Sequence, residues 1–345
     1  MEKTLQHARN RIAAGEAISG WISGSIPARL GNPRSDVDLF LLHDGSDDPP
    51  VQQIIDGAVR IDVEYRRPSE IDRLLDGLAG VPDDRTEGLD RVPSLARLDD
   101  AARLFNALPV DDGPGRAYVE RIQAGEDALR RCRILRATSI CASKSEDVRG
   151  AQEAGDRRQE LEISGRLLLE SLEAYLAGCG EYYVGHKWVF AKLRRTAHHE
   201  PVLRRLDALL FDVGLEDAET VDARVSLAQQ LLAVAFTLGW HRPQAAEWAA
   251  QLPVRAGADV RRLDPQWVPI RYGSVVLLEG LDKNVHVQLT PQGLLLWALA
   301  AAIPATDLYP VFLKTMSNFS DELPTEGDVE EYISQLVERG LLLPG

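Results

Sequence analysis

The sequence is poor in cysteine and has no long hydrophobic run. Its 345 residues include three cysteines, none with the short paired spacing of a zinc site, and a disulfide scaffold of this length would need more. The longest apolar run covers residues 294–303, far short of the roughly 20 residues that span a bilayer. The charged N-terminus also lacks the apolar segment of a signal peptide. We therefore expect a soluble, cytoplasmic protein.

The chain also lacks an excess of positive charge. It has 39 Lys and Arg residues against 53 Asp and Glu residues, which gives a formal net charge of −14 at pH 7. Nucleic acid backbones and anionic lipid surfaces attract proteins with surplus cations, so we expect neither a nucleic acid nor a membrane as partner. The acidity is compatible with binding a nucleotide through metal ions, or a cationic small molecule directly.

Hydrophobic patterning divides the chain into three predicted domains with an α+β fold. Residues 1–110 alternate strand and helix signals and predict a small mixed-sheet domain. Residues 113–250 consist almost entirely of amphipathic helical patterns and predict a helical bundle. A linker follows from residue 251, and residues 265–345 read as a hairpin and three helices, which suggests a winged-helix-like domain.

Within the first domain, the pattern predicts a definite order of elements. Strands are expected at 20–25, 36–44 and 58–67, and helices at 51–56 and 69–80. Ser69 is the expected N-cap of the last helix, since acidic residues follow it in the first turn. A further helix is expected to start at residues 26–30, with Pro27 in its first turn.

Two aspartates, Asp36 and Asp38, lie two positions apart in a strand that is otherwise rich in Val, Leu and Phe. Side chains alternate along a strand, so both carboxylates project from one face. Like charges held this close raise each other's pKa unless a cation lies between them. Asp62 and Glu64 share a face of a later strand, and they join the cluster if the two strands pair.

Such a cluster is stabilised by divalent cations. Two Mg²⁺ ions would neutralise Asp36, Asp38 and Asp62 and would bind the triphosphate of a nucleotide. The sequence therefore predicts a metal site formed by these three carboxylates.

The segment before the aspartates has features of a phosphate-binding loop. Gly24 lets the backbone approach a ligand closely, and a helix after Ser25 would direct its N-terminal N–H groups at an anion. Arg29 and Arg34 could add charge-assisted hydrogen bonds to phosphate oxygens. The candidate nucleotide-binding residues of the chain are Gly24, Ser25, Arg29, Arg34, Ser35 and Lys187. For Lys187, which follows a glycine turn, an ordinary surface position is the simpler interpretation.

The first domain contains Gly-Ser, then ten residues, then Asp-Val-Asp, and later Ile-Asp-Val. This pattern resembles that of the nucleotidyltransferase superfamily that includes DNA polymerase β, most closely that of its aminoglycoside-type members. The resemblance implies that Gly24 and Ser25 bind the triphosphate and that Asp36 and Asp38 bind Mg²⁺. It implies that Asp62 is the third ligand or the base, with Glu64 as the rival for that role. Unlike the polymerases, this chain is acidic and has no evident DNA-binding module, so template-directed synthesis is not expected.

The C-terminal domain resembles the small peptide-binding winged-helix domains of pathways that modify ribosomally made peptides. The resemblance rests on the hairpin, on residues 289–300 and on residues 330–342. It implies that a peptide could add to the edge of the hairpin, whereas a role in packing or dimer contacts alone fits the pattern equally well.

The sequence thus predicts a Mg²⁺-dependent nucleotidyltransferase that moves a nucleoside monophosphate, AMP from ATP, to a hydroxyl group and releases pyrophosphate. The expected acceptor is an aminoglycoside-like antibiotic or another natural-product intermediate. Transfer to a peptide or protein, and a non-catalytic protein that binds nucleotide or leader peptide, remain open alternatives. Glu162 or Glu170 could serve as general base, although a solvated helix face explains both. A homodimer is compatible with the sequence.

Overall fold

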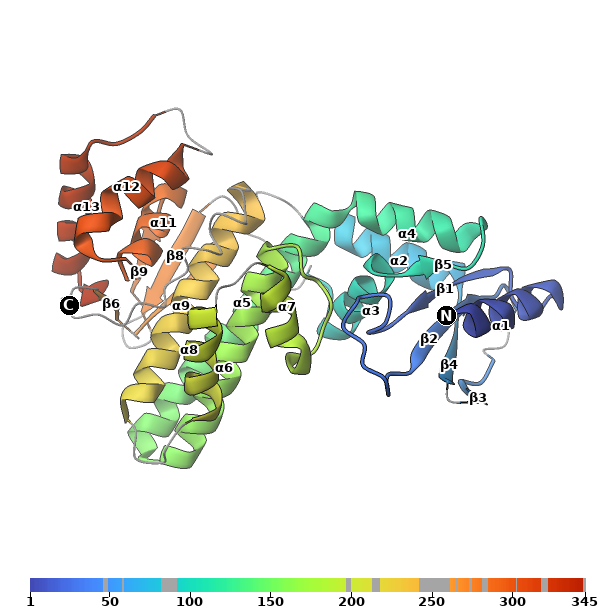
Figure 1. The fold of residues 1–345 in the computed structure, drawn as a ribbon. Helices are drawn as coiled ribbons and strands as arrows, with labels where there is room; N and C mark the ends of the chain where they lie inside the picture. Colours follow the sequence, from blue (N-terminus) through green and yellow to red (C-terminus); the bar gives the residue numbers. More distant parts are fainter. Residues whose placement is uncertain are drawn as a thin grey trace. The chain divides into compact units, whose positions relative to one another are not determined.

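The computed structural model describes the chain except for residues 46–48, 58, 82–91, 197–199, 213–217, 242–260, 265, 273–274, 281–284, 302, 318–321 and 344–345. The described residues form two compact units (Figure 1). The first contains residues 1–81, 90–132 and 182–188, and the second contains residues 133–181 and 189–345. The boundaries of the three predicted domains remain a prediction, and the predicted linker from residue 251 lies mostly outside the described residues.

The first unit is built on a five-stranded mixed sheet with the strand order β3-β4-β2-β1-β5. Strands β2 and β4 are parallel, and the other neighbouring pairs are antiparallel. The predicted α+β class is therefore confirmed. The strands are β1 (Ser19–Ser23), β2 (Val37–Leu42), β3 (Gln52–Asp56), β4 (Val59–Arg66) and β5 (Leu108–Pro109).

One face of this sheet is the hydrophobic core of the unit. Val37, Leu39 and Leu41 of β2 and Ile61 and Val63 of β4 are buried there, and helix α1 packs against them. Because strand side chains alternate, the residues between them project from the opposite face. The helices of the unit are α1 (Glu2–Ala13), α2 (Pro68–Ala79), α3 (Leu95–Phe105), α4 (Pro114–Ala124) and the start of α5 (Glu126–Ala154).

The predicted helix at residues 51–56 is wrong, because this segment is strand β3 and pairs antiparallel with β4. Six residues are too few to form a stable helix alone, and pairing with β4 satisfies their backbone groups instead. Gly57 follows in a left-handed conformation with φ 65°, at the turn into β4.

The predicted helix at residues 26–30 is also wrong, because the segment forms a compact turn. The amides of Leu30 and Gly31 both donate to the carbonyl of Ser25, at 2.8 Å each, which closes a wide turn in place of a helical ladder. Arg29 has φ 57° and ends the turn in the left-handed region. Helix α2, in contrast, forms as predicted but is capped by Arg67, with Pro68 as its first residue, rather than by Ser69.

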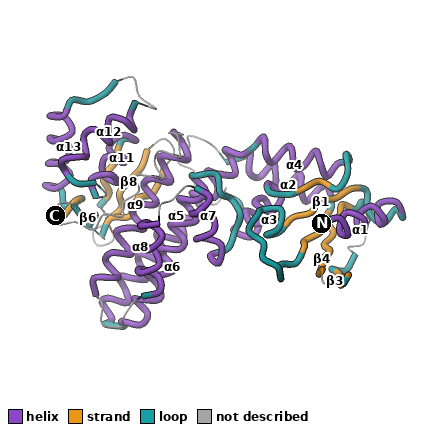
Figure 2. Tube along the Cα trace, viewed as in Figure 1, coloured by secondary structure: helices purple, strands orange, loops and turns teal. Residues whose placement is uncertain are grey.

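The second unit is mainly helical (Figure 2). After the rest of α5 it contains α6 (Arg157–Gly178), α7 (Val189–Arg195), α8 (Glu200–Phe211) and α9 (Ala218–His241), and α6 packs along α9. Its interior includes an ion cluster in which the buried Lys192 ammonium donates to both carboxylate oxygens of Glu173, at 2.7 and 2.6 Å.

The hairpin predicted for the C-terminal part of this unit forms a three-stranded antiparallel sheet in the described residues. Its strands are β7 (Trp267–Tyr272), β8 (Val275–Gly280) and β9 (His286–Leu289), and β8 pairs with both of the others. Short strands β6 (Arg262–Leu263) and β10 (Leu342–Leu343) pair with each other. The three predicted helices are confirmed as α11 (Pro291–Ala300), α12 (Ala305–Met316) and α13 (Glu326–Glu338). The winged-helix interpretation stays a prediction.

Across the part of the chain that the structure describes, no helix combines the length and apolar character needed to cross a membrane.

Candidate functional site

Four polar residues form a row across the face of the sheet opposite α1. In the strand register, Asp38 of β2 lies beside Ser23 of β1 on one side and beside Asp62 of β4 on the other. Asp62 in turn lies beside Gln53 of β3. Partners in neighbouring strands have side chains within contact distance. The parallel pairing of β2 with β4 therefore brings together the two aspartates that the sequence predicts as partners.

The remaining candidate acids extend this row. Asp36 precedes β2, and its carboxylate accepts a hydrogen bond from the guanidinium of Arg60, a residue of β4. This contact lowers the pKa of the Asp36 carboxyl. Glu64 lies beside Phe40, two positions beyond Asp62, and its carboxylate is paired with Arg66 at 2.7 Å.

The pKa of the Asp38 carboxyl is raised. Burial is the main cause of the raised pKa, and the charges of Asp36, Asp62 and Glu64 raise it further, while Arg103 of α3 opposes the shift. The pKa values of the two neighbouring aspartates therefore shift in opposite directions, because Asp36 has an adjacent cation and Asp38 is partly withdrawn from water.

The amide of Gln53 holds the third aspartate in place. Its Nε2 donates a hydrogen bond of 2.8 Å to Oδ1 of Asp62. With Asp36 bound by Arg60 and Asp62 bound by Gln53, the carboxylates do not converge on a point. Among the described residues, no three His, Cys, Asp or Glu side chains form a ready metal site. Arg60 occupies one carboxylate oxygen of Asp36, so a cation that uses this oxygen would displace it.

The donor set nonetheless fits Mg²⁺. The row offers carboxylate oxygens from neighbouring strands, the ligands that this ion prefers.

Gly24 comes directly after β1 and lies against Asp38. Its φ is 93°, a conformation that favours glycine. A Cβ built on it would lie 2.4 Å from Oδ2 of Asp38, so only glycine allows this close approach. Ser25, the next residue, is buried and anchors the turn through its carbonyl.

The other predicted nucleotide-binding residues lie on exposed surface or in a neighbouring turn rather than against the carboxylates of the row. Arg29 and Arg34 are exposed. Ser35 closes a second turn, in which its hydroxyl accepts a hydrogen bond of 2.9 Å from the amide of Asn32. Lys187 is exposed and its ammonium lies 4.9 Å from the ring centroid of Trp188.

Four residues near the row are absent from the site that the sequence predicts: Arg60, Gln53, Arg103 and Tyr183. Arg60 follows the same strand alternation as Asp62, so the pattern contained its signal, whereas Gln53 lies in residues 51–56, which the sequence predicts as a helix. Tyr183 is nearly buried, at 7% exposure. Burial, followed by the charge of Asp38, raises the pKa of its hydroxyl to about 12. It comes from residues 182–188, which follow α6 in the chain but belong to the first unit, and no local pattern reveals that return.

Comparisons with known proteins add little. No family model and no curated protein matches the chain. Among solved structures, it is similar to a nucleotidyltransferase-like protein from Exiguobacterium sibiricum 255-15, with 11% identity and a TM-score of 0.35 over 71% of this chain and 77% of that chain. A similarity this low carries no argument about function, so the functional interpretation rests on the site itself.

Gly24→Ala tests the close approach of the loop to Asp38. The added Cβ meets Oδ2 of Asp38, and alanine is strained at positive φ, so the variant should lose more than about 1 kcal/mol of unfolding free energy in urea. Gly77→Ala is the matched control, since this glycine lies in α2 with nothing within 4 Å of a built Cβ. The control should gain about 0.5–1 kcal/mol. Equal effects of the two substitutions would contradict the account.

Asp38→Asn tests the charge balance of the row. With its pKa raised, the folded protein keeps a proton on Asp38 at pH values where the unfolded chain, with the usual pKa of 3.8, has lost it. The stability contributed by Asp38 therefore falls as the pH rises above 3.8 through the folded pKa. Asp38→Asn should raise the apparent Tm at pH 7 and change it little at pH 3.

Asp36→Asn is the control for that measurement. The pKa of Asp36 is lowered by Arg60, so its ionised form stabilises the fold above pH 3.8, and the substitution should bring no gain at pH 7. If Asp38→Asn lowers the Tm at pH 7, the uncompensated charge assigned to Asp38 is wrong.

Proposed function

We propose that the first unit is a Mg²⁺-dependent nucleotidyltransferase that transfers a nucleoside monophosphate, AMP from ATP, to a hydroxyl group of a small-molecule acceptor. The observation that carries this proposal is the register that sets Asp38 beside Asp62, with Asp36 two residues before and Gly24 against the Asp38 carboxylate. Adjacent carboxylates next to a loop of close backbone approach are suited to a metal-bound phosphate.

In this proposal, Asp36, Asp38 and Asp62 hold two Mg²⁺ ions, and Gly24 and Ser25 contact the triphosphate. Ions held there would neutralise charge on the phosphate oxygens. Arg60 pairs with Asp36 in the free protein, and its guanidinium would be available to phosphate oxygens if that pair opened. Arg29, Arg34, Ser35 and Lys187 are peripheral candidates for the same role, since the first two and Lys187 are exposed.

The chemistry is an in-line displacement at the α-phosphorus. The acceptor oxygen forms a bond to that phosphorus, the bond to the bridging oxygen of the β-phosphate breaks, and pyrophosphate leaves. The hydroxyl proton passes to a carboxylate. We assign this role to Asp62 rather than Glu64, because Glu64 is paired with Arg66 whereas Asp62 accepts a hydrogen bond from the neutral amide of Gln53.

Tyr183 acts as a hydrogen-bond donor in the proposed site. Burial, followed by the charge of Asp38, raises the pKa of its hydroxyl to about 12, and the hydroxyl is protonated at neutral pH, as that of an unperturbed tyrosine also is. A protonated phenol there can donate to a phosphate oxygen.

Metal-dependent nucleotide binding is the direct test of the proposed function. Calorimetry with ATP, GTP, CTP and UTP, each with and without Mg²⁺, should show binding of one nucleotide only when Mg²⁺ is present. Asp38→Asn should abolish that binding because it removes a metal ligand, while Asp112→Asn, at an exposed aspartate paired with Arg116, should leave it unchanged.

Binding of no nucleotide would contradict the proposal and favour a protein without nucleotide chemistry. Nucleotide binding that persists in Asp38→Asn would contradict the metal assignment. Once the donor is known, release of pyrophosphate on addition of a hydroxyl compound separates a transferase from a protein that only binds the nucleotide.

A further inference from the structure

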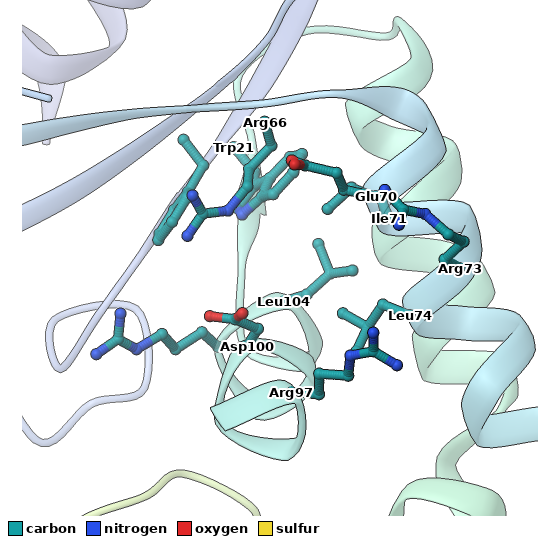
Figure 3. A pocket seen from close by; sticks show the side chains of 11 residues that line it. Trp21, Arg66, Glu70, Ile71, Arg73, Leu74, Arg97, Asp100 and Leu104 are labelled. Carbon is teal, nitrogen blue, oxygen red and sulfur yellow. The ribbon is translucent and has the colours of Figure 1, made fainter. Parts of the chain in front are cut away.

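A cavity of about 380 Å³ opens on the same face of the sheet as the carboxylate row (Figure 3). It lies between the sheet and helices α2 and α3, and its volume is within the range of small-molecule sites. Figure 3 shows Arg66 entering from the sheet, Arg73 from α2, and Arg97 and Asp100 from α3. We call this space the arginine pocket. Its lining residues are Trp21, Phe40, Arg66, Glu70, Ile71, Arg73, Leu74, Arg97, Asp100, Arg103 and Leu104.

The pocket is cationic in an acidic protein. Four arginines line it against two carboxylates, although the chain as a whole carries a net charge of −14. One of the carboxylates, Glu70, accepts a hydrogen bond of 3.1 Å from the amide of Arg67 at the start of α2. The Nε of Arg103 is buried and makes no hydrogen bond within the described structure. A buried donor without a partner is costly, and a bound oxyanion would supply one.

The remaining lining is apolar and largely buried, since Trp21 and Phe40 are each 3% exposed. The rings of Trp21 and Phe40 stack with centroids 5.8 Å apart and planes inclined by 12°, and the guanidinium of Arg66 lies over the Phe40 ring at 5.3 Å. Ile71, Leu74 and Leu104 complete this lining. The pocket is thus suited to a ligand with an apolar body and a negatively charged end.

The pocket adjoins the carboxylate row. Trp21 and Phe40 lie beside each other and two positions from the Ser23–Asp38 pair, on the same face, which is about 7 Å along a strand. Arg103 links the two places, since it lines the pocket and its carbonyl accepts a hydrogen bond of 2.7 Å from the hydroxyl of Ser23, which lies beside Asp38.

The pocket and the Gly24 loop lie on opposite sides of the row. From Asp38, the chain of β2 runs back to Asp36 on the loop side and forward to Phe40 on the pocket side. A triphosphate at Gly24 and Ser25 therefore leaves the pocket for a second molecule.

We propose that the arginine pocket binds the acceptor, and that this acceptor carries an anionic carboxylate or phosphate group beside an apolar ring. The role of this ligand as acceptor rests on the proposed function. An anionic acceptor also differs from the aminoglycoside-like, cationic acceptor expected from the sequence. The oxyanion binds the guanidinium groups of Arg97 and Arg103, the apolar body lies along Trp21 and Phe40, and the accepting hydroxyl points toward Asp62.

Calorimetry without nucleotide or Mg²⁺ tests the pocket independently of the donor site. The probes are phenyl phosphate and benzoate, with benzylamine as the cationic counterpart. At least one anion should bind and benzylamine should not, and the stronger anion identifies the charged group as phosphate or carboxylate. Binding of neither anion, or equal binding of benzylamine, would overturn the proposal.

Two variants place the binding site. Arg97→Gln and Arg103→Gln should each weaken binding of the anion by about tenfold, the effect of losing a charge-assisted hydrogen bond. Arg9→Gln is the matched control, because this exposed arginine lies on α1, which packs on the other face of the sheet, and it should have no effect. Unchanged binding in both pocket variants would show that the anion binds elsewhere.

Competition between the anion and the nucleotide tests whether the acceptor site and the donor site are separate. Addition of the Mg²⁺-bound nucleotide should leave the affinity for phenyl phosphate or benzoate within about twofold, since the two ligands occupy opposite sides of the row. Competitive displacement would assign the arginine pocket to the donor and overturn the acceptor role. A protein that binds the anion but no nucleotide would refute the proposed function while leaving the anion site standing.

Discussion

The parallel pairing of β2 with β4 is the constraint on which the candidate site depends. Its register sets Asp38 beside Asp62, and the opposite face of the same two strands is the hydrophobic core. A slip of one residue would turn the core side chains to the surface and the carboxylates to the interior. The burial of Leu39 and Val63 therefore stabilises the fold and also determines the face on which the aspartates lie.

The cost of this arrangement is electrostatic repulsion, which the protein offsets only in part. Arg60 pairs with Asp36, Gln53 binds Asp62, and Arg103 lies near Asp38. The pKa of Asp38 nevertheless stays raised, because burial and three neighbouring carboxylates outweigh Arg103. Anything that binds the folded state alone stabilises it, so in the proposed function the metal-bound nucleotide supplies the cations that the free protein lacks.

The elements that the sequence predicts well are those whose pattern is local. The alternation of Val37, Leu39 and Leu41 with Asp38 predicts both the strand and its acidic face, and Asp62 repeats that pattern. Residues 26–30 and 51–56 were mispredicted, because tight hydrogen bonds to one carbonyl and pairing with β4 override weak helical preferences. Tyr183 and the arginine pocket depend on segments brought together from distant parts of the chain, which periodicity alone cannot reveal.

The location of the metal ions tests the central claim most directly. Crystals grown with Mn²⁺ in place of Mg²⁺ and with a non-hydrolysable analogue of the nucleotide donor would show the ions by anomalous scattering. The account predicts two ions in contact with Asp36, Asp38 and Asp62, with Arg60 moved from Asp36 and the phosphates next to Gly24. Ions bound elsewhere, or an analogue bound while Arg60 still pairs with Asp36 and the carboxylates hold no ion, would contradict it.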